Sequence, residues 1–112
     1  MDMATLENKW KGYFFGIGHP ANNIQWKFKF PNGYGASVIF GPNSYGSDEG
    51  LYELALIEWA DDEHYHLAYH DCVQGDVLGY LTIEDIDTML TQIMSGRIDD
   101  QPDIYKEDLS DH

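Results

Sequence analysis

The chain has 112 residues, of which 20 are acidic, six are basic and 43% are hydrophobic. This length suits one domain with one core, and the hydrophobic content argues against a disordered chain. The net charge of −14 opposes direct binding to nucleic acid or lipid head groups and favours a basic protein partner.

The expected location is the cytoplasm, without membrane insertion. The N-terminus lacks a basic start followed by an apolar block, and no apolar run approaches the roughly 18 residues of a membrane span. The single cysteine, Cys72, cannot form an internal disulfide, which favours a reducing compartment.

Charge is distributed unevenly along the chain. Residues 1–47 hold four lysines against two acids, a net of +2. Residues 48–112 hold the other 18 acids against two basic residues, a net of −16. A field of this sign attracts basic surfaces, although solubility alone is an equal explanation of it.

The first 23 residues give a weak structural pattern. Leu6, Trp10, Tyr13 and Phe14 recur at roughly helical spacing, which predicts a short helix from about Thr5 to Phe14. Glycine, proline and asparagine are concentrated in residues 16–23, so we expect a loop there.

The stretch from Ile24 to Phe40 predicts a β-hairpin. Apolar and polar residues alternate over residues 24–30, which is typical of a strand with one buried face. Pro31, Asn32 and Gly33 suit a three-residue loop. That loop sets the register, with the following expected opposite pairs: Phe30 and Tyr34, Phe28 and Ala36, Trp26 and Val38, Ile24 and Phe40.

Two more strands are predicted after a long loop at residues 41–50. Residues 51–59 are apolar on both parities, which indicates a strand covered on both faces. A polar turn at residues 61–63 then leads to a fourth strand over His64–His70. Short links between successive strands favour an antiparallel meander.

The last predicted element is an amphipathic helix that follows a connection at residues 71–81. Thr82 and Asp85 form an approximate capping box, and Gly96 suits the position just after the helix end. The fold class is therefore α+β: a four-stranded antiparallel sheet with the C-terminal helix packed on one face. Residues 1–98 form the predicted domain, and residues 99–112 form an acidic C-terminal tail.

His64 and His66 are the candidate metal ligands. Alternate residues of a strand share a face and lie roughly 6.6 Å apart, and Glu53, Glu58 or Asp71 could complete a zinc site. Half-exposed histidines paired with nearby acids are the favoured alternative, because the spacing supplies only two ligands.

No set of residues predicts catalysis. Cys72 follows His70 by two positions, but no orienting group or oxyanion hole accompanies them. A buried structural cysteine is the favoured interpretation. We therefore expect a non-enzymatic protein that needs no cofactor.

Four short motifs resemble small bacteriophage and prophage proteins that have no assigned reaction. They cover roughly residues 24–96 and read Tyr34-Gly-Ala-Ser-Val-Ile, Ser44-Tyr45-Gly, Gly50-Leu-Tyr-Glu-Leu-Ala and Val77-Leu-Gly-Tyr-Leu-Thr. The resemblance implies a phage-encoded accessory protein made in the bacterial host cytoplasm.

These observations favour an acidic protein that binds a basic, nucleic-acid-binding host enzyme or complex. It would act as a nucleic-acid mimic that inhibits a restriction or CRISPR complex. A metal protein centred on His64 and His66, and a self-associating assembly protein such as a homodimer, are the alternatives. The predicted partner-binding residues are Tyr45, Asp48, Glu49, Asp61, Asp62, Glu63, Glu84, Asp85 and Asp87.

Overall fold

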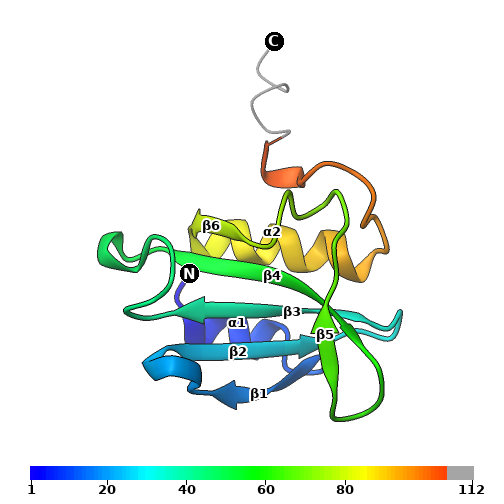
Figure 1. Ribbon diagram of the computed structural model, residues 1–112, viewed down its shortest axis with the longest axis horizontal. Coiled ribbons are helices and arrows are strands. Elements are labelled where there is room, and N and C mark those ends of the chain that lie inside the picture. Colours follow the sequence, from blue (N-terminus) through cyan, green and yellow to red (C-terminus); the bar gives the residue numbers. More distant parts are fainter. Residues whose placement is uncertain (106–112) are drawn as a thin grey trace.

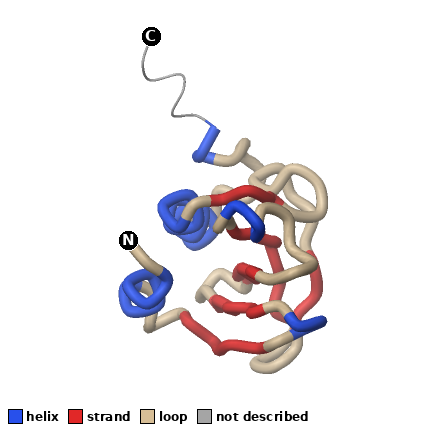
Figure 2. Tube along the Cα trace, turned by 90° about the vertical axis from the view of Figure 1, so that its left-hand side faces the viewer, coloured by secondary structure: helices blue, strands red, loops and turns tan. Residues whose placement is uncertain are grey.

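A computed structural model describes residues 1–105 as an antiparallel sheet with two α-helices on one face (Figures 1 and 2). The strands are β1 (Phe14–Gly18), β2 (Ile24–Lys29), β3 (Tyr34–Phe40), β4 (Tyr52–Trp59), β5 (Tyr65–Leu67) and β6 (Leu78–Leu81). The helices are α1 (Met3–Lys9) and α2 (Ile83–Met94), with short 3₁₀ turns η1 (Pro20–Asn22), η2 (Ser47–Glu49) and η3 (Asp103–Tyr105). The predicted α+β class and antiparallel sheet are confirmed.

Strands β1 to β4 follow one another across the sheet, and β5 and β6 share the far edge of β4. β5 pairs with residues 57–59 of β4, and β6 pairs with residues 52–54. The chain thus leaves this edge after β5, makes an excursion over residues 68–77, and returns to the same edge as β6. Among the described residues, no helix is long and apolar enough to cross a membrane.

The predicted hairpin register is confirmed. Phe28 lies opposite Ala36, Trp26 opposite Val38 and Ile24 opposite Phe40. The Phe30 amide donates to the Tyr34 carbonyl at 2.9 Å, which closes the three-residue loop. The alternate residues of β2 and β3 that face the helices are consequently buried in one core.

The prediction of four strands was wrong, because β1 and β6 are also present. Phe14 belongs to β1 rather than to a helix, since pairing with β2 outweighs the helical spacing of its aromatic neighbours. Helix α1 accordingly ends at Lys9, and it begins earlier than predicted because Asp2 caps it by accepting from the Thr5 amide. β6 has only four residues, too few for a recognisable alternation.

Helix α2 forms as predicted. The Thr82 side chain accepts from the Asp85 amide, and the Asp85 side chain accepts from the Thr82 amide, which completes the capping box. Gly96, at φ +86°, follows the helix end in the left-handed conformation that glycine adopts without strain. The apolar stripe of the helix is fully buried against the sheet: Ile86, Met89, Leu90 and Ile93.

The described residues place no α-helix on the second face of the sheet, and aromatic side chains cover part of it instead. The Trp59 indole lies across Gly35 and donates to the Phe28 carbonyl at 3.1 Å. A Cβ atom on Gly35 would lie 2.6 Å from the indole nitrogen and 1.9 Å from the Phe28 oxygen, so only glycine fits there. Phe15 stacks on Trp59, and Lys29 lies over the indole ring. This arrangement explains why β4 is apolar on both parities.

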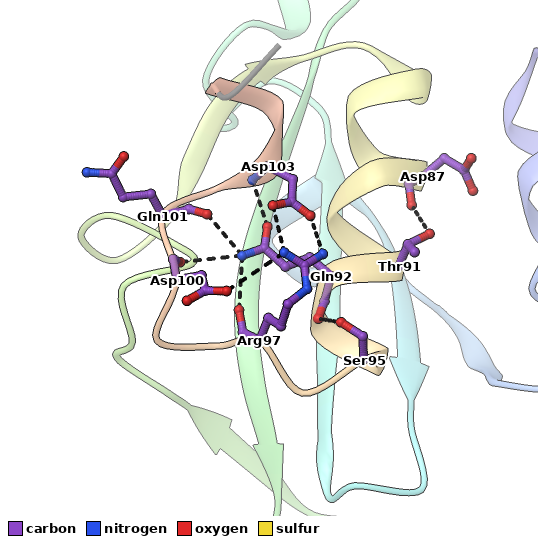
Figure 3. Close-up of polar contacts among 8 residues, drawn as sticks. All are labelled: Asp87, Thr91, Gln92, Ser95, Arg97, Asp100, Gln101 and Asp103. Carbon is purple, nitrogen blue, oxygen red and sulfur yellow. Dashed lines mark hydrogen bonds and ion pairs between the residues drawn. The ribbon is translucent and has the colours of Figure 1, made fainter. Parts of the chain in front are cut away.

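A buried glutamine in α2 fixes the chain that follows the helix (Figure 3). The Gln92 amide nitrogen donates to the carbonyls of Arg97, Asp100 and Gln101, and its oxygen accepts from the Asp103 amide. Arg97 also pairs with the Asp103 carboxylate. Residues 99–105 of the predicted acidic tail are therefore docked on α2, and residues 106–112 lie outside the described residues.

We expect Gln92→Ala to lower the free energy of unfolding by about 2 to 4 kcal/mol, because it removes the hydrogen bonds of a fully buried side chain and leaves a cavity in its place. Urea titration followed by circular dichroism measures the change. Thr91→Ala is the matched control, since the neighbouring hydroxyl is exposed, and its effect should stay within about 0.5 kcal/mol. Equal effects of the two substitutions would contradict this role of Gln92.

Candidate functional site

Two segments far apart in the sequence meet at one end of β4. The Tyr80 amide of β6 donates to the Tyr45 carbonyl in the loop between β3 and β4, at 3.4 Å. A Cβ atom on Gly79 would lie 2.8 Å from the Tyr45 Cβ, so glycine permits this approach. The Glu53 carboxylate accepts from the Tyr45 amide at 2.9 Å and holds the loop to the sheet.

This contact presents two tyrosines to solvent. Tyr45 is 62% exposed and Tyr80 is 59% exposed. Tyr80 also has φ +58°, a left-handed conformation that costs a bulky residue about 1 to 2 kcal/mol. Strained residues of this kind occur preferentially at functional sites, where the surrounding structure holds them in place.

Free carboxylates lie beside the two tyrosines. Asp48 and Glu49 form part of η2 in the same loop as Tyr45, and both are exposed. Neither carboxylate makes a hydrogen bond or ion pair with residues 1–105. The start of α2 lies at the same end of the sheet (Figure 1), but the Glu84 carboxylate in its first turn pairs with the N-terminal amine of Met1 at 3.2 Å. We name the surface formed by Tyr45, Asp48, Glu49 and Tyr80 the tyrosine end.

Two other predicted partner-binding acids at the start of α2 have structural roles. Asp85 completes the helix cap. The Asp87 carboxylate accepts from the Trp10 indole at 2.8 Å and from Lys9 at 2.7 Å, which ties α1 to α2. Because both carboxylates are engaged within the molecule, they are poorly placed to bind a partner.

The three acids at residues 61–63 lie at the opposite end of β4. Eight residues of strand separate them from the tyrosine end, which is roughly 23 Å. Asp61 accepts from the backbone amides of Glu63 and His64, and these bonds lower its pKa. Asp62 pairs with Lys29 at 3.1 Å. The nine predicted residues therefore do not form one surface.

The candidate metal ligands each lie beside their own carboxylate. His64 lies in the turn before β5 and pairs with Asp61 at 2.9 Å. His66 lies 3.6 Å from Glu58. Within residues 1–105, no three histidine, cysteine, aspartate or glutamate side chains are grouped so that they could hold a metal ion.

Cys72 is fully buried, as the sequence suggested. Burial raises the pKa of its thiol to about 11, with the nearby carboxylates of Asp99 and Asp71 acting in the same direction. At neutral pH the sulfur is therefore a poorly ionised thiol, the opposite of an activated nucleophile.

Comparison of the chain with family models, with curated proteins and with solved structures finds no match. Its function has to be inferred from its own residues. The sequence interpretation selected Tyr45, Asp48 and Glu49 but omitted Tyr80 from the predicted site. Gly79 would have been a signal only inside a recognised strand, where glycine often marks a bulge or a close backbone approach, but residues 71–81 were predicted to be a connection.

We expect Tyr80→Gly to be more stable than Tyr80→Ala by about 1 kcal/mol, because only glycine adopts a positive φ without strain. Thermal unfolding of the two variants measures the difference. The matched pair of variants is Ile17→Gly and Ile17→Ala in β1. Ile17 is also exposed, but its φ is not positive, so the alanine variant should be the more stable there. If alanine is the more stable residue at both positions, the assignment of strain to Tyr80 is wrong.

We expect a thiol-reactive dye to modify Cys72 at pH 8 at least about a hundredfold more slowly in the native protein than in urea. The reason is that burial blocks access and a pKa of about 11 leaves only about a thousandth of the thiol ionised. Stopped-flow absorbance records both rates. Comparable rates in the two states would show that the thiol is accessible and reactive.

Proposed function

We propose that this chain is a non-enzymatic protein-binding module whose tyrosine end docks on a basic surface of another protein. The observation that supports the proposal best is the exposed pair Tyr45 and Tyr80, held by close backbone contacts beside the unpaired carboxylates of Asp48 and Glu49.

Tyrosine suits this role for physical reasons. Its ring buries a large apolar area at low cost in side-chain entropy, and its hydroxyl remains able to hydrogen-bond. Tyrosine is accordingly enriched among the residues that dominate binding energy at interfaces, as is arginine. Here the loop backbone is fixed by Gly79 and by Glu53, so little ordering remains to be done when a partner binds.

The charge of the whole chain acts over longer distances. Three of the six basic residues are paired with acids inside the molecule: Lys9, Lys29 and Arg97. The net charge of −14 creates a negative field around the protein. This field accelerates encounter with a basic surface and repels nucleic acid.

The narrower form of the proposal concerns the partner, a nucleic-acid-binding host enzyme such as a restriction or CRISPR complex. Duplex DNA carries one charge per roughly 1.7 Å of its axis, and the grooves that bind it are basic. An acidic protein with exposed aromatic rings can occupy such a groove as a mimic. The 18 acids after residue 47 support this form.

The test is an affinity pulldown from a bacterial lysate with the tagged chain, washed at roughly 0.05 M and 0.5 M salt. We expect a basic nucleic-acid-binding protein to be retained at low salt and lost at high salt. Tyr45→Ala with Tyr80→Ala should reduce retention at least about tenfold. Asp48→Asn with Glu49→Gln should reduce it about threefold to tenfold and weaken its salt dependence.

Asp62→Asn with Glu63→Gln is the matched control, because it removes the same charge from the opposite end of β4. We expect it to change retention by less than about twofold. Recovery of the bait alone would refute the proposed function. Equal losses from both charge-changing variants would show that net charge, rather than the tyrosine end, carries binding.

A further inference from the structure

The excursion between β5 and β6 surrounds a hollow of about 250 Å³ that opens to solvent. Its lining residues are Tyr69, His70, Asp71, Val73, Gln74, Gly75 and Asp76. Val73 is 1% exposed, whereas Tyr69 is 64% exposed. The hollow therefore has a closed apolar side and an aromatic ring that solvent reaches.

One wall of the hollow is held firmly. The His70 ring lies 3.0 Å from the Asp99 carboxylate through Nδ1 and 3.4 Å from the Tyr34 hydroxyl through Nε2. The Cys72 amide donates to the Ile98 carbonyl at 2.8 Å. These contacts join the excursion to β3 and to the segment docked by Gln92, so this wall of the hollow is anchored to the rest of the fold.

The polar groups of the hollow are suited to a cation. Asp71 and Asp76 line it, and neither carboxylate makes a hydrogen bond or ion pair with residues 1–105. Within residues 1–105, no lysine or arginine lines the hollow. Gln74 also lines the hollow, and its side chain carries an amide oxygen that can accept a hydrogen bond.

An organic cation suits the hollow better than a metal ion. The described residues offer no group of three side chains that could hold a metal. The volume is below the roughly 300 Å³ at which sites for drug-sized ligands begin, which matches one amino-acid side chain. An aromatic ring beside carboxylates favours a flat cation, because guanidinium stacks on the ring while its edge donates to the carboxylates.

We propose that this hollow binds the guanidinium group of an arginine in the partner protein, between the Tyr69 ring and the carboxylates of Asp71 and Asp76. The inference rests on the proposed function, because it supplies a specific contact for a basic partner. It differs from the tyrosine end in selecting arginine over other cations.

The test is a titration of the isotope-labelled chain with arginine amide, followed by backbone amide chemical shifts. We expect saturable shifts confined to residues 69–76 with a Kd of the order of millimolar. Citrulline amide, which is neutral and nearly isosteric, should give shifts at least about tenfold smaller, and lysine amide should bind at least about threefold more weakly.

Two variants and a control complete the test. Asp71→Asn with Asp76→Asn, and separately Tyr69→Ala, should each weaken arginine amide binding at least about tenfold. Asp48→Asn with Glu49→Gln removes equal charge elsewhere and should change binding less than twofold. Shifts spread over the surface, or equal shifts with citrulline amide, would overturn the arginine site.

The titration contains no partner protein, so it separates this inference from the proposed function. Specific arginine binding together with a pulldown that recovers only the bait would support the site and refute the function. A retained basic partner together with no shifts at residues 69–76 would refute the site and leave the tyrosine end as the binding surface.

Discussion

The three-residue loop that closes the hairpin between Phe30 and Tyr34 is the constraint on which the rest of the structure depends. A slip of one residue would exchange the two faces of the strand. The core residues of β3, Ala36 and Val38, would then face away from the helices. Gly35 would also leave its place under the Trp59 indole. Register, core and the aromatic cover of the second face are therefore set together.

The sheet has two kinds of edge, and the difference between them places the candidate sites. β1 closes one edge with uncharged residues. The other edge is divided between β5 and β6, because the chain departs and returns along β4. The departure creates the hollow, and the return brings Tyr80 against Tyr45. Both sites therefore exist because two separate short strands, β5 and β6, share one edge of β4.

Negative charge serves two purposes in this molecule. Some carboxylates make contacts that stabilise the fold: Asp2 and Asp85 cap helices, Asp87 joins α1 to α2, and Asp61 accepts hydrogen bonds within a turn. Others have no partner within residues 1–105, among them Asp48, Glu49, Asp71 and Asp76. Unpaired acids repel one another and oppose compaction. The two proposed sites are built on these unpaired acids and on exposed tyrosines.

The sequence by itself determined the elements whose signals are local. Alternation and turn chemistry gave the β2–β3 hairpin with its register, the apolar residues of β4 predicted cover on both faces, and capping residues placed α2. Only the tertiary structure decided β1 and β6, since each is short and exists because a neighbouring strand offers unpaired backbone groups. It also decided the positive φ of Tyr80, the burial of Gln92, and which acids are engaged inside the fold. Those features depend on contacts between residues distant in the chain, and no local pattern records such contacts.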